Sequence, residues 1–171
     1  KLIVGPWTHG GQGSSFAGEV EFPPEAALQL SEWRLRWFDR WLKGVENGGE
    51  NEAPVKLFIM GGGGGRKTAA GRLFHGGRWR DEEAFPLART RFTPYYLHAD
   101  GRLGTDPPPE TSSSTTYRFD PGDPVPTIGG NLSSVQGLLS AGGFDQRCRP
   151  ETLFAKAQIP LSERRDVLVF Q

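Results

Sequence analysis

The sequence has little cysteine, no net charge and no long hydrophobic run, and each lack excludes a class of protein. Cys148 is the single cysteine among 171 residues, so a secreted scaffold stapled by internal disulfides is excluded. Lysine plus arginine and aspartate plus glutamate are 20 each, so no net field attracts nucleic acid, anionic lipid or an acidic partner. No apolar run approaches the ~20 residues that span a bilayer. We therefore expect a small neutral substrate, no nucleic-acid or membrane partner and, by default, a cytoplasmic location.

Histidine is also scarce, and its distribution argues against a metal centre. The three histidines are scattered, and none stands at metal-ligand spacing from another histidine or from Cys148. We expect His75 and His98 to be solvated, because glycine or turn residues follow them, and Cys148 to be a partly buried, unreactive thiol. No cofactor and no metal is predicted, and nothing in the sequence decides for or against a homo-oligomer.

The residues at both ends of the chain indicate that further parts of the protein, which would pack against them, are missing. Lys1 is neither a starting methionine nor the opening of a signal peptide. Asp166–Gln171 has the composition of a strand that is apolar on both faces, and it stops without a turn or a partner. Because such a strand normally lies inside a sheet, we expect both ends to be cuts in a larger protein.

The first 44 residues have the pattern of a strand, a loop and a helix. Lys1–Val4 is apolar and is followed by Gly5-Pro6, which suits the last strand of a buried parallel sheet. After a glycine-rich loop, Pro23-Pro24-Glu25 predicts the start of a helix that ends at Gly44. Its apolar stripe predicts packing on a sheet, and its mixed-sign polar face disfavours a membrane-surface helix. The stripe consists of Leu30, Trp33, Trp37, Phe38, Trp41 and Leu42.

After the turn-forming residues 46–53, which we expect to be a linker, the sequence has the pattern of short strands. Val55–Ile59 alternates apolar residues with Lys56, Tyr95–His98 leads into a turn, and Tyr117 and Phe119 flank Arg118. Prolines in the long connections bar these from central strands. The pattern predicts an all-β sandwich or jelly roll, so the chain as a whole has a mixed fold class.

His9 is the residue that could carry chemistry. It follows a buried strand, lies in a loop and precedes a long helix, which is where an α/β-hydrolase carries its catalytic base. In that fold the triad comes in the order Ser, Asp or Glu, then His, so a chain that begins at the last strand would retain only the histidine. A loop histidine alone is more often a solvated residue, and spacing by itself does not decide between the two interpretations.

Several short blocks of residues follow one another along the chain and together cover essentially all of it. The blocks are Gly5–His9, Leu35–Gly44, Pro54–Gly61, Trp79-Arg80 with Phe85-Pro86, Thr93–Leu97, Asp120–Gly130, Asp145–Arg147 and Asp166–Phe170. Their order and spacing are more specific than any one block. In this order they resemble the CocE/NonD acyl hydrolases, a family that is similar to the X-Pro dipeptidyl-peptidases and the α-amino acid ester hydrolases.

The resemblance implies a serine hydrolase acting on a small-molecule ester or peptide substrate. Residues 1–45 would close its α/β-hydrolase domain, 46–53 would be the linker, and 54–171 would form a truncated jelly roll of the galactose-binding-like, X-Pro dipeptidyl-peptidase C-terminal type. His9 aligns with the catalytic histidine of the family. The serine, the acid, the oxyanion hole and the cap would lie upstream, so this piece alone is expected to be inactive and to need the remainder of its catalytic domain as a partner.

Two glycine motifs suggest other chemistry but lack a required residue. Gly13–Ala17 has Ala17 where G-x-S-x-G needs its second glycine, and it follows the histidine, so we interpret it as loop. Gly61–Thr68 has Arg66 where a phosphate loop needs its second glycine, and a flexible hairpin or loop is favoured there.

A different class of function stays open from the sequence. Trp79, Tyr95 and Tyr96 could form a platform for carbohydrate, which would make the strand-rich part an autonomous binding module. Packing in a core or a domain interface is the favoured interpretation of these aromatics, because large rings contribute most buried area. The first 44 residues also argue against a lectin, in which they would have no role.

Overall fold

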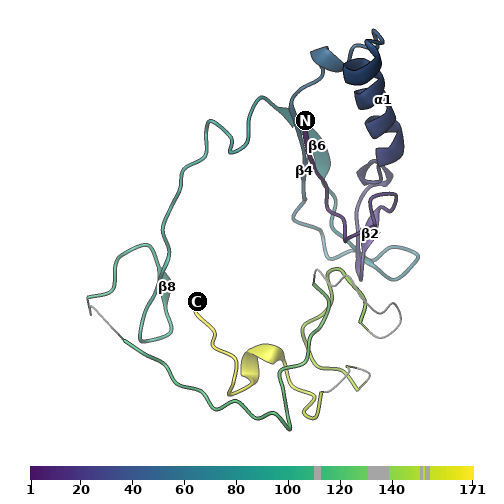
Figure 1. Ribbon diagram of the computed structural model, residues 1–171. Coiled ribbons are helices and arrows are strands. Elements are labelled where there is room, and N and C mark those ends of the chain that lie inside the picture. Colours follow the sequence, from purple (N-terminus) through teal and green to yellow (C-terminus); the bar gives the residue numbers. More distant parts are fainter. Residues whose placement is uncertain (110–112, 131–138, 151, 153–154) are drawn as a thin grey trace. The chain divides into compact units, whose positions relative to one another are not determined.

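A computed structural model describes residues 1–109, 113–130, 139–150, 152 and 155–171 of the chain (Figure 1). The contacts divide it into two compact units. The first unit comprises Lys1–Ala88 and Gly129–Phe144, and the second comprises Arg89–Ile128 and Asp145–Gln171. Each unit is described by itself below.

The main sheet of the first unit has three strands in the order β1-β4-β6. They are β1 (Leu2–Val4), β4 (Val55–Ile59) and β6 (Arg78–Glu82). β1 runs parallel to β4, and β6 runs antiparallel to it. The strands predicted for the first residues and for 55–59 are therefore confirmed. The domain boundary predicted near residue 45 stays a prediction, although the strands on its two sides pair with each other.

The core of the first unit forms around β4, which is buried on both faces. Val55 and Leu57 point to one face, and Phe58 points to the other, where it meets Phe22 and Trp79 edge-on with ring centroids 5.7 and 5.3 Å apart. Edge-to-face aromatic pairs of this kind stabilise the fold beyond the burial of their surface. The core therefore lies next to the segment that leads from the His9 loop to the helix.

A second small sheet and a glycine-rich loop adjoin this core. The sheet has the order β2-β3-β5, with β2 (Phe16–Ala17), β3 (Val20–Glu21) and β5 (Leu73–Phe74). The glycine run ends in a hairpin, in which Thr68 N–H bonds to Arg72 O and Gly71 N–H to Thr68 O. The loop or hairpin interpretation of Gly61–Thr68 is thus confirmed.

The helix begins later than predicted. Residues Pro24–Ala26 form only a short 3₁₀ turn, η1, and the α-helix α1 spans Leu30–Lys43. The chain leaves the helical path at Ala27, whose ψ is 132°, and the next amide, that of Leu28, donates 2.8 Å to the backbone oxygen of Gln12. This loop contact competes with a continuous helix. The predicted end is confirmed, because Gly44 adopts a left-handed φ of 71° that a glycine accepts without strain.

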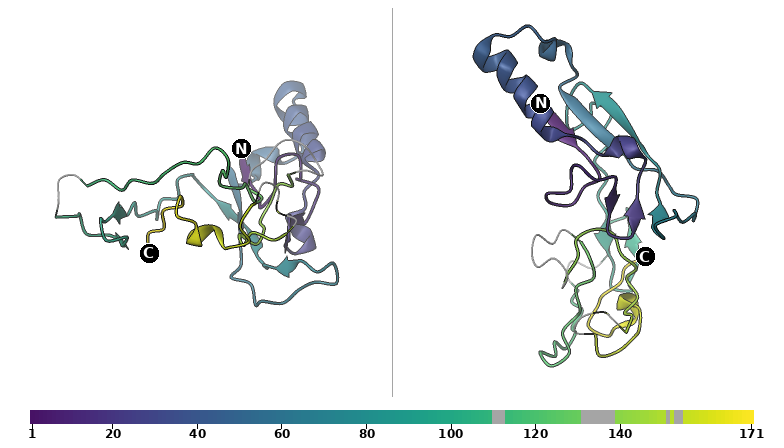
Figure 2. Two further views of the ribbon diagram at one scale, coloured as in Figure 1. Left: turned by 90° about the horizontal axis from the view of Figure 1, so that it is seen from below. Right: turned by 90° about the vertical axis from the view of Figure 1, so that its right-hand side faces the viewer.

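The sequence predicts that α1 packs on a sheet, and the described residues show this contact only as a loose one. No residue of α1 is buried, and Trp41 is 55% exposed. The helix runs beside the main sheet (Figures 1 and 2), and a groove of about 390 Å³ separates part of its apolar stripe from Ile3 of β1. Three strands leave little apolar surface to cover the stripe, so the helix is held by polar contacts instead.

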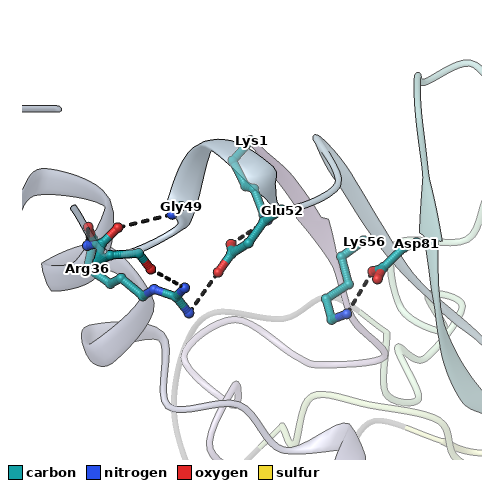
Figure 3. A network of polar contacts seen from close by, with 7 residues as sticks. Lys1, Arg36, Gly49, Glu52, Lys56 and Asp81 are labelled. Carbon is teal, nitrogen blue, oxygen red and sulfur yellow. Dashed lines mark hydrogen bonds and ion pairs between the residues drawn. The ribbon is translucent and has the colours of Figure 1, made fainter. Parts of the chain in front are cut away.

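These polar contacts centre on Glu52 (Figure 3). Its carboxylate accepts from Lys1 Nζ at 2.7 Å and pairs with an Arg36 guanidinium nitrogen at 2.8 Å. Arg36 also donates to Asn47 O at 2.6 Å, and the Asn47 amide returns a bond of 2.8 Å to Arg36 O. The predicted linker, which contains the short turn η2 (Gly49–Asn51), thus joins α1 to the start of β1.

The second unit has little regular structure among its described residues. β7 (Tyr96–Leu97) and β8 (Leu103–Gly104) form a hairpin, which confirms the strand and turn predicted near residue 96. The strands predicted for 117–119 and 166–171 are wrong, since neither segment is a strand in the structure. Gln171 exchanges backbone hydrogen bonds with Gly101 and Leu103 of the hairpin. A strand needs a ladder partner, and a favourable composition does not supply one.

One helix and several small sheets make this a mixed, β-rich chain, and at that level the predicted fold class is confirmed. The α/β-hydrolase and jelly-roll assignments stay predictions. A short 3₁₀ turn, η3 (Leu161–Glu163), is the last regular element. Within the described ranges, no helix is long and apolar enough to cross a membrane.

Candidate active site

His9 lies in an exposed turn of the first unit, directly after β1. The turn is closed by a bond of 3.0 Å from Gly11 N–H to Thr8 O, and the chain turns again at Ser14, whose N–H bonds to Gly11 O. The imidazole is exposed to solvent. A histidine placed in this way is accessible to a reacting group from outside the loop.

The loop is anchored to the core just before His9. The Trp7 indole Nε1–H donates to Ala26 O at 2.7 Å, and the ring lies 5.6 Å from the Trp79 ring. Gly5 lies beneath this indole, because a Cβ there would be 2.5 Å from its ring atoms. Ala26 is fully buried. Sequence reasoning missed this anchor, because Trp7 and Ala26 are 19 residues apart and no local pattern signals their contact.

A second contact holds the loop after His9. Leu28 N–H donates to Gln12 O at 2.8 Å. Trp7 and Gln12 thus fix both sides of the turn that carries His9. The loop is tied to η1 and to the residues that lead into α1, so its backbone path does not depend on the exposed imidazole.

Among the described residues, no hydrogen bond or ion pair joins His9 to a carboxylate or a hydroxyl group. The structure therefore brings no other triad residue to His9. A general base needs a partner that holds its tautomer and a nucleophile within about 3 Å. Both would have to come from residues beyond those described.

The Gly13–Ala17 motif does not form a nucleophile elbow. Phe16 and Ala17 form β2 and pair with β3 in a tight hairpin, so the prediction of loop is wrong for these two residues. Ser15 O accepts from Phe22 N–H at 2.8 Å. A nucleophile elbow needs a sharp turn from a strand into a helix, and no helix follows here.

The two other histidines are less solvated than predicted. His98 is 6% exposed, and its Nδ1 lies 3.1 Å from an Arg102 guanidinium nitrogen across the β7–β8 turn. His75 is half-buried, with its ring 5.8 Å from that of Phe22. Turn residues nearby do not ensure exposure when an arginine side chain folds back over the ring.

Neither the single cysteine nor any group of possible metal ligands forms a candidate site among the described residues. Cys148 is a free thiol and is buried, rather than partly buried as predicted. In the part of the chain that the structure describes, no three His, Cys, Asp or Glu side chains are grouped so that they could hold a metal ion. A buried thiol of this kind behaves as a small apolar side chain.

The aromatic residues considered as a platform for carbohydrate belong to two different units. Trp79 packs on the core with Phe58 and donates its indole N–H to Glu25 O at 2.6 Å, so its predicted packing role is confirmed. Tyr95 is exposed and Tyr96 is half-buried, both in the second unit. Sugar binding by the two tyrosines stays untested.

The second unit contains a buried charge cluster that the sequence did not reveal. The Arg164 guanidinium donates to both carboxylate oxygens of Asp166, at 2.8 and 2.7 Å, and to Asp123 O at 2.8 Å. The hydrogen bonds from Arg164 hold the pKa of Asp166 below its usual range. Asp123 and Arg164 are 41 residues apart, so no local pattern signals their contact. A satisfied cluster of this kind holds loops together.

Asp145 has a similar environment closer to the surface. Arg147 donates through Nε to both carboxylate oxygens, at 2.9 and 3.0 Å, and Arg149 adds a bond of 3.2 Å. The hydrogen bonds from Arg147 hold the pKa of Asp145 far below its usual range. Asp145 is therefore an anion at any physiological pH and is not a proton donor.

Comparison with known proteins was made against family models and against curated sequences. No family model matches the chain. The chain is 31% identical to cocaine esterase of Rhodococcus sp. (strain MB1 Bresler), over 99% of this chain and 26% of that protein. The chain is thus similar to proteins that are named esterases. It is also 26% identical to "Putative serine esterase Mb1866c" of Mycobacterium bovis, over 97% of this chain and 24% of the relative.

The chain spans about a quarter of the length of the curated relatives it matches. The relation to esterases therefore covers nearly all of this chain but only a small part of each relative. It supports the predicted hydrolase relationship and leaves the residues of the reaction to be tested.

Proposed function

We propose that this chain is part of a serine hydrolase that cleaves small acyl esters or amides, with His9 as general base and general acid. The observation that carries the proposal is the similarity to cocaine esterase across 99% of the chain. The position of His9 agrees with it, because the residue follows a parallel strand, lies in an anchored loop and precedes a 14-residue helix. In α/β-hydrolases the catalytic histidine has this position.

The proposed chemistry follows the serine-hydrolase scheme. His9 accepts the proton of the serine hydroxyl as its oxygen attacks the acyl carbon, and then gives that proton to the leaving alcohol or amine as the carbon–oxygen or carbon–nitrogen bond breaks. Water, deprotonated by His9, then hydrolyses the acyl-enzyme and regenerates the serine. An acidic residue would hold the imidazole in the correct tautomer. Neither the serine nor the acid is assigned to a residue of this chain.

We further propose that residues 1–45 close an α/β-hydrolase domain and that 54–171 belong to a jelly roll of the X-Pro dipeptidyl-peptidase C-terminal type. The parallel strand β1, the His9 loop and α1 support the first part, since they follow in the order of the last strand, the histidine loop and the last helix of that fold. The apolar stripe of α1 would then be covered by the remainder of the catalytic domain.

The proposal is tested by ester hydrolysis in the full-length protein that contains this chain. With p-nitrophenyl acetate as substrate, His9→Ala is expected to lower kcat by about 10³-fold or more, because a triad without its base loses most of its catalysis. His75→Asn, which changes a histidine that has no role in the proposed reaction, is expected to stay within about twofold. The 171-residue chain alone is expected to show no turnover. Full activity of His9→Ala would overturn the proposal.

A further inference from the structure

We propose that Trp7 is the positioning residue that fixes His9 for proton transfer. The inference rests on the proposed function, because it assigns a role to a neighbour of the proposed general base. Trp7 does not reach the reacting atoms. It acts through the backbone of the loop, whose next residues are Thr8 and His9.

The indole of Trp7 is fixed on three sides. Its Nε1–H donates to Ala26 O at 2.7 Å, and its ring is tilted by 51° against Trp79 with centroids 5.6 Å apart. On the third side the ring covers Gly5, where any side chain would collide with it. Since Ala26 has 0% exposure and belongs to the core cluster, the bond partner itself cannot shift without disturbing the core.

The turn that carries His9 is therefore short and closed at both ends. Trp7 fixes it on one side, and the bond from Leu28 N–H to Gln12 O fixes it on the other. Between them the bond from Gly11 N–H to Thr8 O shapes the turn. Loss of the Trp7 anchor would let the backbone that carries His9 shift. A shift of about 1 Å in a reacting group can cost on the order of 10²-fold in rate.

The chain offers a matched control for this contact. Trp79 makes the same kind of bond to the adjacent residue of η1, from Nε1–H to Glu25 O at 2.6 Å, and its ring is the partner of Trp7 in the tilted pair. However, Trp79 lies on β6 and not on the His9 loop. Trp7→Phe and Trp79→Phe therefore remove equivalent bonds, but only the first one removes a bond that the His9 loop itself makes, while Phe at position 79 keeps an aromatic ring against Trp7.

The test measures kcat and KM for p-nitrophenyl acetate, together with thermal stability, in the full-length protein. Both variants are expected to lose similar thermal stability. Trp7→Phe is expected to lower kcat by about 10- to 100-fold with KM within about threefold, because positioning affects the proton transfer more than binding. Trp79→Phe is expected to keep kcat within about twofold. If Trp7→Phe does not fold, 3-benzothienylalanine at position 7, which keeps both rings and lacks only the N–H, replaces it.

The outcomes separate the inference from the function on which it rests. Equal kcat losses in the Trp7 and Trp79 variants, with an inactive His9→Ala, would overturn the positioning role and leave the hydrolase proposal intact. An active His9→Ala would overturn both. A selective kcat loss at position 7 beside an inactive His9→Ala supports the inference.

Discussion

At the scale of single residues, the His9 loop depends on Gly5. Because Gly5 has no side chain, it leaves the space that the Trp7 indole fills. A methyl group at Gly5 would lie 2.5–2.6 Å from three ring atoms of Trp7 and force the indole off Ala26 O. Gly5→Ala is expected to lower the free energy of unfolding by about 1–3 kcal/mol, as overpacking of a tight contact does. Urea unfolding followed by tryptophan fluorescence measures this. Gly62→Ala, where a Cβ meets nothing within 4 Å, is the control, and equal stability of the two variants would contradict the packing described.

Acid sensitivity of the second unit follows from two carboxylates whose pKa values are lowered by arginine. Hydrogen bonds from Arg164 lower the pKa of Asp166, and those from Arg147 lower the pKa of Asp145. A lowered folded-state pKa contributes stability that is present above the unfolded pKa, about 3.9, and is lost as pH falls through the folded value. Thermal unfolding midpoints are thus expected to fall as the pH drops below about 4. The Asp166→Asn variant is expected to have a lower unfolding midpoint than the wild type at pH 7, and its midpoint should fall less than that of the wild type between pH 5 and 2. If the variant and the wild type showed the same pH dependence, the ion pair between Arg164 and Asp166 would be contradicted.

Burial at the residue scale was the least predictable property. The sequence correctly predicted that His9 lies in a loop after a strand, because the Gly5-Pro6 pair that ends the strand is a local signal. The burial of His98 depends on the arginine four residues later folding over it, and Cys148 lies where its backbone N–H bonds to Ile159 O, eleven residues further along the chain. Contacts of this kind are not encoded in a periodic pattern.

At the scale of elements, β4 is the strand on which the first unit depends. Phe58 is packed between Phe22 and Trp79, so Phe58→Ala is expected to cost about 3–5 kcal/mol in the free energy of unfolding, the usual cost of removing a buried phenyl ring. Phe92→Ala is the control, because Phe92 is 84% exposed, and it should be nearly neutral. Chemical denaturation measures both. A neutral Phe58→Ala would show that the core lies elsewhere.

Elements specified by local signals were predictable, and elements that need distant partners were not. Strands β1 and β4 follow from apolar runs, and the end of α1 follows from Gly44. The start of α1 was missed, because the bond between Leu28 and Gln12 is a contact across the loop. Strands expected at 117–119 and 166–171 have favourable residues but form no strand ladder among the described residues. Alternation identifies a surface that could pair and does not identify its partner.

At the scale of the whole molecule, the chain contains His9 as the one proposed catalytic residue of a reaction that needs a serine, an acid and a histidine. Its similarity to esterases covers 99% of its own length and 26% of cocaine esterase, and its described residues bring neither a serine nor a carboxylate to His9. The sequence could predict the position of His9 and the hydrolase relationship. It could not predict how Trp7 and Gln12 anchor the loop, because these contacts depend on the fold of η1 and the residues after it.

The most direct test of the central claim is covalent labelling of the full-length protein by a fluorophosphonate probe, which reacts with an activated serine. Wild type and His9→Ala are compared at equal concentration, with thermal unfolding to confirm that both are folded. The account predicts rapid labelling of the wild type and loss of labelling in His9→Ala, because the serine is then without its base. A folded wild type that does not label, or a His9→Ala variant that labels at the wild-type rate, would contradict it.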